Sequence, residues 1–243
     1  MMQFKKQIPV LVIVIIVILG IRSSIIEPFR IPTRSMLPGL MMGDFLFANK
    51  FYYGLHLPFS EWLTNSPLYI SATRSPERGD VVIFTPPEAG QENLYIKRIV
   101  GLPGDKISFE GKQFFLMEQR IPRVEVTGTE RDDILKNKGF DPEERYRVEK
   151  LHVFKETLGN RTYSILEDDS FEASRSPQEI IVPPDNYFVL GDNRDDTRDS
   201  RVFGVIPFNA IRGKAFVIWL SYRISLHDSQ WSFRPERIGK LIR

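Results

Sequence analysis

The chain has 243 residues, enough for one large domain or for a smaller core with an insertion. Its 33 basic and 31 acidic residues leave a net charge of +2, which argues against nucleic-acid binding because no global basic field is present. The chain contains no Cys, which excludes disulfides, thiol nucleophiles and cysteine zinc sites. Any catalysis must therefore come from other side chains.

An apolar run without charges covers residues 8–21 near the start of the chain. As a helix it would reach about 21 Å, and an extension to Ile26 brings the length to about 28 Å. We therefore predict a transmembrane anchor at 8–26, preceded by a short tail at 1–7. A cleaved secretory signal is the alternative, but no small residues at the −3 and −1 spacing end the run. Basic residues on both sides leave the orientation open.

Prolines and strand-like runs organise the rest of the chain. Pro28, Pro32 and Pro38 exclude a long helix and predict an extended or turning segment. Runs of β-branched and aromatic residues between Gly and Pro then predict strands. These strands are expected at 44–47, 81–84, 95–100, 106–109, 161–166, 186–190 and 214–220. The fold is therefore predicted to be mainly β.

A polar, charge-dense stretch lies in the middle of the chain. It separates the segments 101–105 and 191–195, and it is predicted to be irregular. We expect a smaller cap domain inserted at 106–185 into a β core formed by 27–105 and 186–243. The basic and aromatic segment at the end of that core, 231–237, is predicted to be a solvated tail, with contact to a membrane surface as the alternative.

Ser35 and Lys97 form a candidate catalytic pair. In the strand expected at 95–100, period-two alternation places Lys97 between Tyr95 and Ile99 on one face. If that face is buried, desolvation lowers the lysine pKa, and a drop of about 2 to 3 units from about 10.4 gives a neutral amine near pH 7 to 8. A neutral amine can take the proton from a serine hydroxyl, as in Ser-Lys acyl transfer.

Other chemistries fit the sequence less well. His56, His152 and His227 show no metal-ligand spacing, and the G-x-S-x-G elbow of many serine-histidine hydrolases is missing around Ser35. The acidic stretch 191–201 does not fit the calcium-loop pattern. Counted from Asp195 as position 1, the position of the invariant Gly holds Ser200 and that of the Glu holds Ile206. We expect neither a metal nor another cofactor.

Five motifs follow the apolar run in order. They are Phe29-x-Ile31-Pro32-Thr33-x-Ser35-Met36-x-Pro38; Gly43-Asp44-Phe45 with Asn49-Lys50-Phe51-x-Tyr53-Gly54; Arg78-Gly79-Asp80-Val81-Val82-x-Phe84; Tyr95-Ile96-Lys97-Arg98-x-Val100-Gly101-Leu102-Pro103-Gly104-Asp105; and Gly191-Asp192-Asn193-Arg194-Asp195-x-Thr197-x-Asp199-Ser200-Arg201. With the anchor, they resemble bacterial type I signal peptidases, membrane-bound Ser/Lys endopeptidases that remove signal peptides from exported preproteins. The resemblance covers most of the chain outside the insertion and implies a signal-peptidase-like catalytic β core.

The resemblance also implies roles for single residues. Ser35 would be the nucleophile and Lys97 the general base, acting through an acyl-enzyme. The oxyanion hole would use the backbone N–H of Ser35 and the hydroxyl of Thr33. Thr33 replaces the commoner Ser, and its β-branching restricts the aim of that hydroxyl.

A supporting set around the lysine follows from the same resemblance. Thr197 aligns with the hydroxyl that positions the lysine amine, and it also replaces a Ser. Asp199 is expected to form a local ion pair with Arg201, and Asp192 to meet Arg98 across the core.

Two further positions depart from the family pattern. Asp196 stands where the family usually has Asn and would raise the lysine pKa if it pointed inward; we expect it to face solvent. Gly39 stands where the family often has Thr, which puts one loop contact in doubt.

Substrate binding is implied in the same way. The family accepts small residues at −1 and −3 of the cleavage site in shallow apolar pockets, and simple core packing is the alternative role for the matching residues. The positions that match the −1 pocket are Ile31, Pro32, Met36, Leu40, Tyr95 and Ile96, and those that match the −3 pocket are Phe29 and again Ile96. The implied partners are signal peptides and the lipid bilayer, with the protein a monomer.

The resemblance implies a location in the bacterial plasma membrane. The chain would span it once, with the tail at 1–7 in the cytoplasm and the catalytic domain on the extracytoplasmic side. Two other functions are alternatives to the removal of signal peptides. Self-cleavage like that of SOS-response repressors, which share the catalytic fold, is disfavoured by the anchor and by the absence of a DNA-binding helix pair. A membrane-anchored, non-catalytic binding or assembly module is the alternative in which the segment around Ser35 is only a turn.

Overall fold

The computed structural model describes residues 7–14, 25–57, 60, 67–72, 74–87, 93–136, 148–171, 179–224 and 231–242. Residues 7–14 are helical, and residues 15–24 of the predicted anchor lie outside the described part. Within the described part, none of the helices has the length and apolar character needed to cross a bilayer. The predicted end of the anchor differs from the structure, because Ile26 already pairs with Asn49 as the first residue of a strand.

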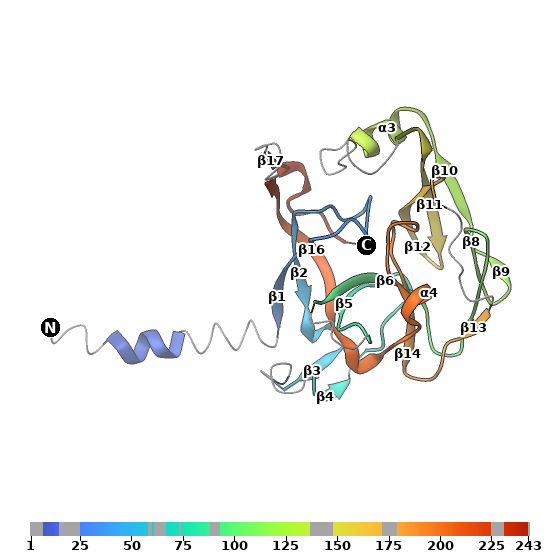
Figure 1. The fold of residues 1–243 in the computed structure, drawn as a ribbon. Helices are drawn as coiled ribbons and strands as arrows, with labels where there is room; N and C mark the ends of the chain where they lie inside the picture. The colour runs from blue at the N-terminus through green and yellow to red at the C-terminus, as the bar shows by residue number, and fades with distance from the viewer. Residues whose placement is uncertain are drawn as a thin grey trace.

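An eight-stranded sheet, here called the central sheet, forms the core of the fold. Its strand order is β1-β2-β16-β5-β6-β14-β15, with β17 paired to β16. The strands are β1 (Ile26–Arg30), β2 (Asp44–Asn49), β5 (Val81–Phe84), β6 (Tyr95–Gly101), β14 (Asn186–Leu190), β15 (Ile206–Pro207), β16 (Ile211–Ile224) and β17 (Trp231–Phe233). Register shifts along β16 let this long strand bend as it passes from β5 to β2 (Figure 1).

The part of the chain that lies between β6 and β14 in sequence forms two further sheets. One has the order β13-β7-β8-β9, and the other, here called the inserted sheet, has the order β10-β11-β12. Their elements are β7 (Lys106–Glu110), β8 (Gln113–Leu116), β9 (Gln119–Arg120), β10 (Arg123–Val126), α3 (Gly128–Lys136), β11 (Leu151–Leu158), β12 (Arg161–Asp168) and β13 (Glu179–Ile181). Both lie on the side of the central sheet away from β1 and β2 (Figure 1).

The remaining described elements are short. They are β3 (Gly54–His56), β4 (Tyr69–Ala72), α4 (Ser200–Phe203) and 3-10 turns at Lys50–Tyr52, Val148–Lys150, Phe208–Ala210 and Pro235–Arg237. The strands β3 and β4 pair with each other below the central sheet in Figure 1. The fold is therefore mainly β.

The strands predicted from the sequence are all present, most of them longer than predicted. The prediction that the middle stretch is irregular is wrong, because its described part contains seven strands. The long strand β11 was missed since charged residues interrupt its apolar pattern. One of these, Glu156, is buried and paired with Arg194, so a charge that reads as surface in the sequence is part of the core.

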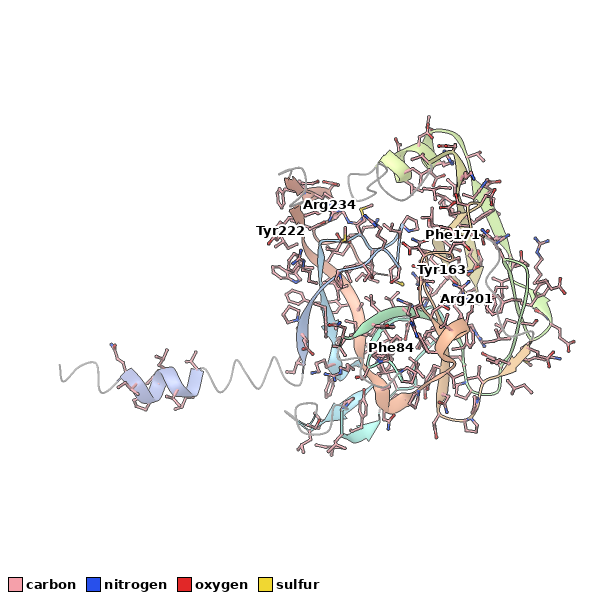
Figure 2. All side chains as sticks on the ribbon, in the orientation of Figure 1. Phe84, Tyr163, Phe171, Arg201, Tyr222 and Arg234 are labelled. Atoms are coloured by element: carbon pink, nitrogen blue, oxygen red, sulfur yellow. The ribbon has the colours of Figure 1, made fainter. Side chains whose placement is uncertain are left out.

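Apolar packing joins the segment after β1 to the inserted sheet. Leu37 and Met41 are fully buried together with Leu151, Val153 and Leu166 of the inserted sheet. Figure 2 places Phe84 near the centre of the molecule and Tyr222 near its margin, in agreement with their burial. The segment that contains Ser35 is thus held between the two sheets.

Candidate active site

Ser35 lies in a turn-rich loop between β1 and β2, here called the serine loop (residues 31–43). The loop is closed at its base, since Ile31 N donates to Asp44 O at 2.8 Å and Gly43 N donates to Ile31 O at 2.9 Å. Gly43 has a φ of 88°, and a Cβ there would lie 2.4 Å from the carbonyl oxygen of Tyr222. A glycine is therefore required where the loop rejoins the sheet.

Asp44 fastens the far end of the serine loop. Its buried carboxylate accepts hydrogen bonds from Met41 N at 2.8 Å, Ser221 Oγ at 2.6 Å and Arg237 Nη2 at 2.6 Å. Arg237 also donates to the carbonyl oxygen of Gly39 at 2.9 Å. The prediction of a solvated tail at 231–237 is therefore wrong for Arg237, because the buried carboxylate of Asp44 draws this guanidinium into the core.

Ser35 and Lys97 meet where the serine loop crosses β6. Lys97 Nζ lies 2.8 Å from Ser35 Oγ and 2.9 Å from the carbonyl oxygen of Ile96. Both residues are buried, Ser35 with 7% and Lys97 with 4% of its surface exposed. Thr33 Oγ1 lies 3.3 Å from Ser35 Oγ. Two hydroxyls and one amine thus form a continuous chain of contacts.

Burial decides the protonation of Lys97. Desolvation lowers its pKa to about 8, and the carboxylates of Asp199 and Asp192 oppose this shift by raising it. Desolvation wins because the amine has little water left to solvate its charge. Near pH 8 a substantial fraction of Lys97 is neutral and has a lone pair facing Ser35 Oγ.

Two ion pairs hold the elements around the lysine. Arg98, on the opposite face of β6, donates to Asp192 at 2.8 and 2.7 Å, and both side chains are buried. Asp199 accepts from Arg201 Nη2 at 2.9 Å and from Gly191 N at 3.1 Å. The structure therefore brings together both residue pairs that the sequence analysis named.

Thr197 and Asp196 lie differently from what the sequence suggested. Thr197 Oγ1 is buried and has no hydrogen-bond partner in the described part of the chain, so the structure does not join it to the amine of Lys97. It packs against Gly191, where a Cβ would lie 2.3 Å from Thr197 Oγ1 and 2.6 Å from the carbonyl oxygen of Ser35. Asp196, expected to face solvent, is half-buried and lines the groove described next.

A groove of about 1070 Å³ opens over Ser35 and Lys97. Four residues of the predicted substrate site line it, namely Phe29, Pro32, Tyr95 and Ile96. Two more, Ile31 and Met36, do not line it but pack in the apolar cluster that contains Ile96. Leu40 belongs to the same cluster and lines a second cavity of about 350 Å³ instead of the groove.

The described residues contain no group of three or more His, Asp or Glu side chains that could hold a metal ion. His152 contacts Glu125 at 2.7 Å and Asp169 at 3.0 Å on the exposed side of the inserted sheet. The side chain of His56 and the whole of His227 lie outside the described part.

Comparison with known proteins decides the family. The family model described as signal peptidase, peptidase S26, matches residues 4–220. The chain belongs to this family. It is a serine endopeptidase that removes signal peptides, and the resemblance seen in the sequence is confirmed.

Individual relatives agree with this assignment. A signal peptidase I of Rickettsia akari is 37% identical over 89% of this chain and 79% of that protein. One of Buchnera aphidicola subsp. Schizaphis graminum is 33% identical over 91% and 76%, and one of Pseudomonas aeruginosa is 32% identical over 86% and 70%. A crystal structure of a signal peptidase I from Enterococcus faecalis V583 covers 59% of this chain and 98% of that one, at 24% identity and a TM-score of 0.33, too low to support an argument.

Some groove residues of this signal peptidase were missed by the sequence analysis. Leu94 directly precedes β6, and Phe171 follows β12 in the insertion. Both residues line the groove. Figure 2 shows Phe171 and Tyr163 beside the ribbon of the inserted sheet, and Arg201 beside that of α4. Phe171 belongs to no motif, and only the packing of the insertion brings it to the groove. Leu94 stands directly beside a motif, so its position in the sequence was a usable signal.

Proposed function

We propose that this signal peptidase cleaves exported preproteins with Ser35 as nucleophile and Lys97 as general base. The observation that carries the proposal is the buried 2.8 Å contact between Lys97 Nζ and Ser35 Oγ, together with a lysine pKa of about 8. An exposed serine and lysine would not react in this way, since a solvated lysine stays protonated at pH 8.

The reaction proceeds in two halves. Neutral Lys97 takes the proton of Ser35 Oγ as the oxygen attacks the scissile carbonyl, and the protonated amine then gives that proton to the leaving amine. The acyl-enzyme remains on Ser35 until Lys97 takes a proton from a water molecule that attacks the ester. In both halves the oxyanion is bound by the Ser35 N–H and the Thr33 hydroxyl, the donor arrangement that stabilises developing charge.

Substrate specificity follows from the groove beside this pair. A signal peptide in extended conformation would add a strand next to the serine loop and β6, with alternate side chains entering the groove. Phe29, Tyr95 and Ile96 form an apolar part of the wall, and Ile31 and Met36 pack in the same apolar cluster as Ile96. Small residues such as alanine at −1 and −3 fit these shallow positions.

We also propose the architecture predicted from the sequence. The catalytic core comprises 27–105 and 186–243, and 106–185 form the cap; Phe188 of β14 pairs with Gly101 of β6, so the ends of the insertion lie side by side. An anchor that starts at residue 8 and ends before β1 spans a bacterial plasma membrane once and places the core, as a monomer, on the extracytoplasmic side.

An aromatic surface supports contact with the bilayer. The residues Phe45, Phe47, Phe216, Trp219 and Tyr222, here called the aromatic face, stack on one another across β2 and β16. Aromatic rings of this kind favour the interface between lipid and water. The face adjoins β1, the strand that follows the apolar run, so anchor and face can reach the same membrane surface.

The proposed function is tested by peptide cleavage with the full chain in detergent. A peptide containing Ala-x-Ala should be cut once, after the second alanine. Ser35→Ala and Lys97→Ala should each abolish the cut while the melting transition is kept. Lys106→Ala, which removes a partly exposed lysine outside the groove, should cut normally. If Lys97→Ala turns over normally at pH 8, the dyad is wrong; if the wild-type protein never cuts, the binding-module alternative gains support.

A further inference from the structure

Asn193 contacts the backbone of the nucleophile on two sides. Its side-chain Nδ2 donates to the carbonyl oxygen of Arg34 at 3.2 Å, and its backbone N donates to the carbonyl oxygen of Ser35 at 3.1 Å. Asn193 is fully buried. These bonds fix the two peptide units that flank the Cα atom of Ser35.

The bond to Arg34 matters because of the geometry of the peptide unit. The carbonyl of Arg34 and the N–H of Ser35 belong to the same peptide group. This group is trans, since the only cis peptide recorded in the described part is Leu37–Pro38. In a planar trans group the C=O and N–H point in opposite directions. When Asn193 holds the carbonyl, the Ser35 N–H is directed away from Asn193, and polarisation of the group strengthens it as a donor.

Asn193 is itself held rigidly by the insertion. Leu166 N donates to the carbonyl oxygen of Asp192 at 2.9 Å, and Arg194 N donates to that of Leu166 at 2.8 Å. These two bonds bracket Asn193 and attach it to β12. Leu166 also packs in the apolar cluster that contains Leu37 of the serine loop. Leu166 of the inserted sheet therefore contacts both the backbone around Asn193 and the serine loop.

We infer that Asn193 is a positioning residue that aims the Ser35 N–H at the oxyanion of the transition state. The inference rests on the proposed function, in which that N–H is one of two oxyanion donors. Only a donor can serve at this place, because a carbonyl oxygen can only accept. The inserted sheet contributes to catalysis through this contact, without touching the substrate at that point.

The test uses the full chain in detergent with two variants. Asn193→Leu keeps nearly the same shape but has no hydrogen-bond donor, and Asn193→Ala removes most of the side chain. We expect kcat for an Ala-x-Ala peptide to fall about 2- to 12-fold, the range for one lost neutral hydrogen bond, with KM changed less than about twofold. The pH midpoint of the reaction should not move, because no charge near Lys97 has changed.

Two inhibitors separate positioning from a merely structural role. A peptide aldehyde adds to Ser35 and places an oxyanion in the hole, whereas the same peptide with CH₂ in place of the scissile carbonyl fills the groove without one. We expect the aldehyde to bind more weakly by the same factor as the loss in kcat, and the reduced peptide to bind as before. Equal weakening of both, or an unchanged kcat, would overturn the inference.

Controls keep the result decisive. Lys112→Met removes a contact of 2.9 Å to Asp195, elsewhere in the same loop, and should lower the melting temperature without changing kcat. If Asn193→Leu does not fold, Asn193→Ala provides the same comparison. Ser35→Ala and Lys97→Ala are measured alongside: activity in either would refute the proposed function, whereas active Asn193 variants beside inactive dyad variants refute only the role of Asn193.

Discussion

Lys97 is the residue on which the pH dependence of this enzyme turns. Burial lowers its pKa to about 8, against the opposing field of Asp199 and Asp192. Because the neutral amine is the active form in the proposed mechanism, kcat/KM should rise with pH to a plateau, with a midpoint near 8 in the free enzyme. At pH 7 it should be about a tenth of the plateau value. Initial rates on an Ala-x-Ala peptide from pH 6 to 10 measure this, and a profile that is flat from pH 7 to 9 would contradict it.

Thr33 offers a second prediction at the scale of a single residue. Its hydroxyl lies 3.3 Å from Ser35 Oγ, close enough to serve the same oxyanion. Thr33→Val keeps the shape and removes the donor, so kcat should fall about 100- to 1000-fold with little change in KM. Thr33→Ser keeps the donor and should retain activity close to that of the wild-type enzyme. Equal activity of the Val and Ser variants would show that this hydroxyl takes no part.

Gly191 tests how tightly the site is packed. A Cβ at this position would lie 2.6 Å from the carbonyl oxygen of Ser35 and 2.3 Å from Thr197 Oγ1. Gly191→Ala should therefore displace Ser35 from Lys97 and lower kcat by at least about 100-fold, since small misplacements are costly in catalysis. Gly39→Ala is the matched control, because its Cβ would meet Asp192 Oδ2 at an ordinary 3.4 Å. Similar activities of the two variants would show that the packing at Gly191 is not critical.

The sequence predicted some residues of the site better than others, for physical reasons. The alternation of the strand correctly indicated that Lys97 is flanked by apolar neighbours, because side-chain direction in a strand is a local property. The burial of Asp44 with Arg237 could not be predicted, since 193 residues separate them. The same holds for Phe171, which reaches the groove only through the packing of the insertion.

At the scale of elements, the strands of the central sheet were predictable and those of the insertion largely were not. The strands β5 and β14 have the predicted bounds, because both are short, apolar and fully delimited by turn residues. In the insertion, charged residues such as Glu156 pair inside the protein with Arg194. Such pairs remove the alternation of apolar and polar residues on which strand prediction depends.

The aromatic face provides the prediction at the scale of elements. Trp219 is 38% exposed and stacks on Phe47. Trp219→Ser combined with Phe47→Ser should weaken binding to phospholipid vesicles about tenfold or more, since each ring loses its place at the interface. Cleavage of a soluble peptide in detergent should remain within about twofold. The vesicle assay uses the catalytic region without the first 24 residues, provided that it folds with a cooperative melting transition.

The matched control for that assay is Val124→Ser. Val124 is 71% exposed on β10 of the inserted sheet, so this change removes apolar surface far from the aromatic face. It should leave vesicle binding unchanged. A loss of binding as large as that of the Trp219 and Phe47 variant would mean that apolar surface in general, and not this face, holds the protein at the membrane.

For the molecule as a whole, the buried Lys97 works against stability. The pKa of Lys97 falls from an ordinary 10.5 in the unfolded chain to about 8 in the folded protein. The unfolded state therefore binds more protons between these values, so this residue destabilises the fold fully below pH 8 and ceases to do so as the pH rises toward 10.5. The shift of about 2.5 pKa units corresponds to about 3 kcal/mol at pH 7.

Replacing that lysine should consequently stabilise the inactive protein. We expect Lys97→Met, which keeps the apolar stem and removes the charge, to raise the free energy of unfolding at pH 7 by about 1 to 3 kcal/mol, the lower value allowing for the lost bonds to Ser35 and Ile96. By pH 9.5 the advantage should shrink by about 2 kcal/mol, because most of the charge penalty has then disappeared from the wild-type protein. Urea unfolding of both proteins in detergent at the two pH values measures the difference. Lys106→Met serves as the control, since Lys106 is partly exposed and carries no burial penalty of this size. If Lys97→Met raised the free energy of unfolding equally at both pH values, burial of the Lys97 charge would not be what destabilises the wild-type fold.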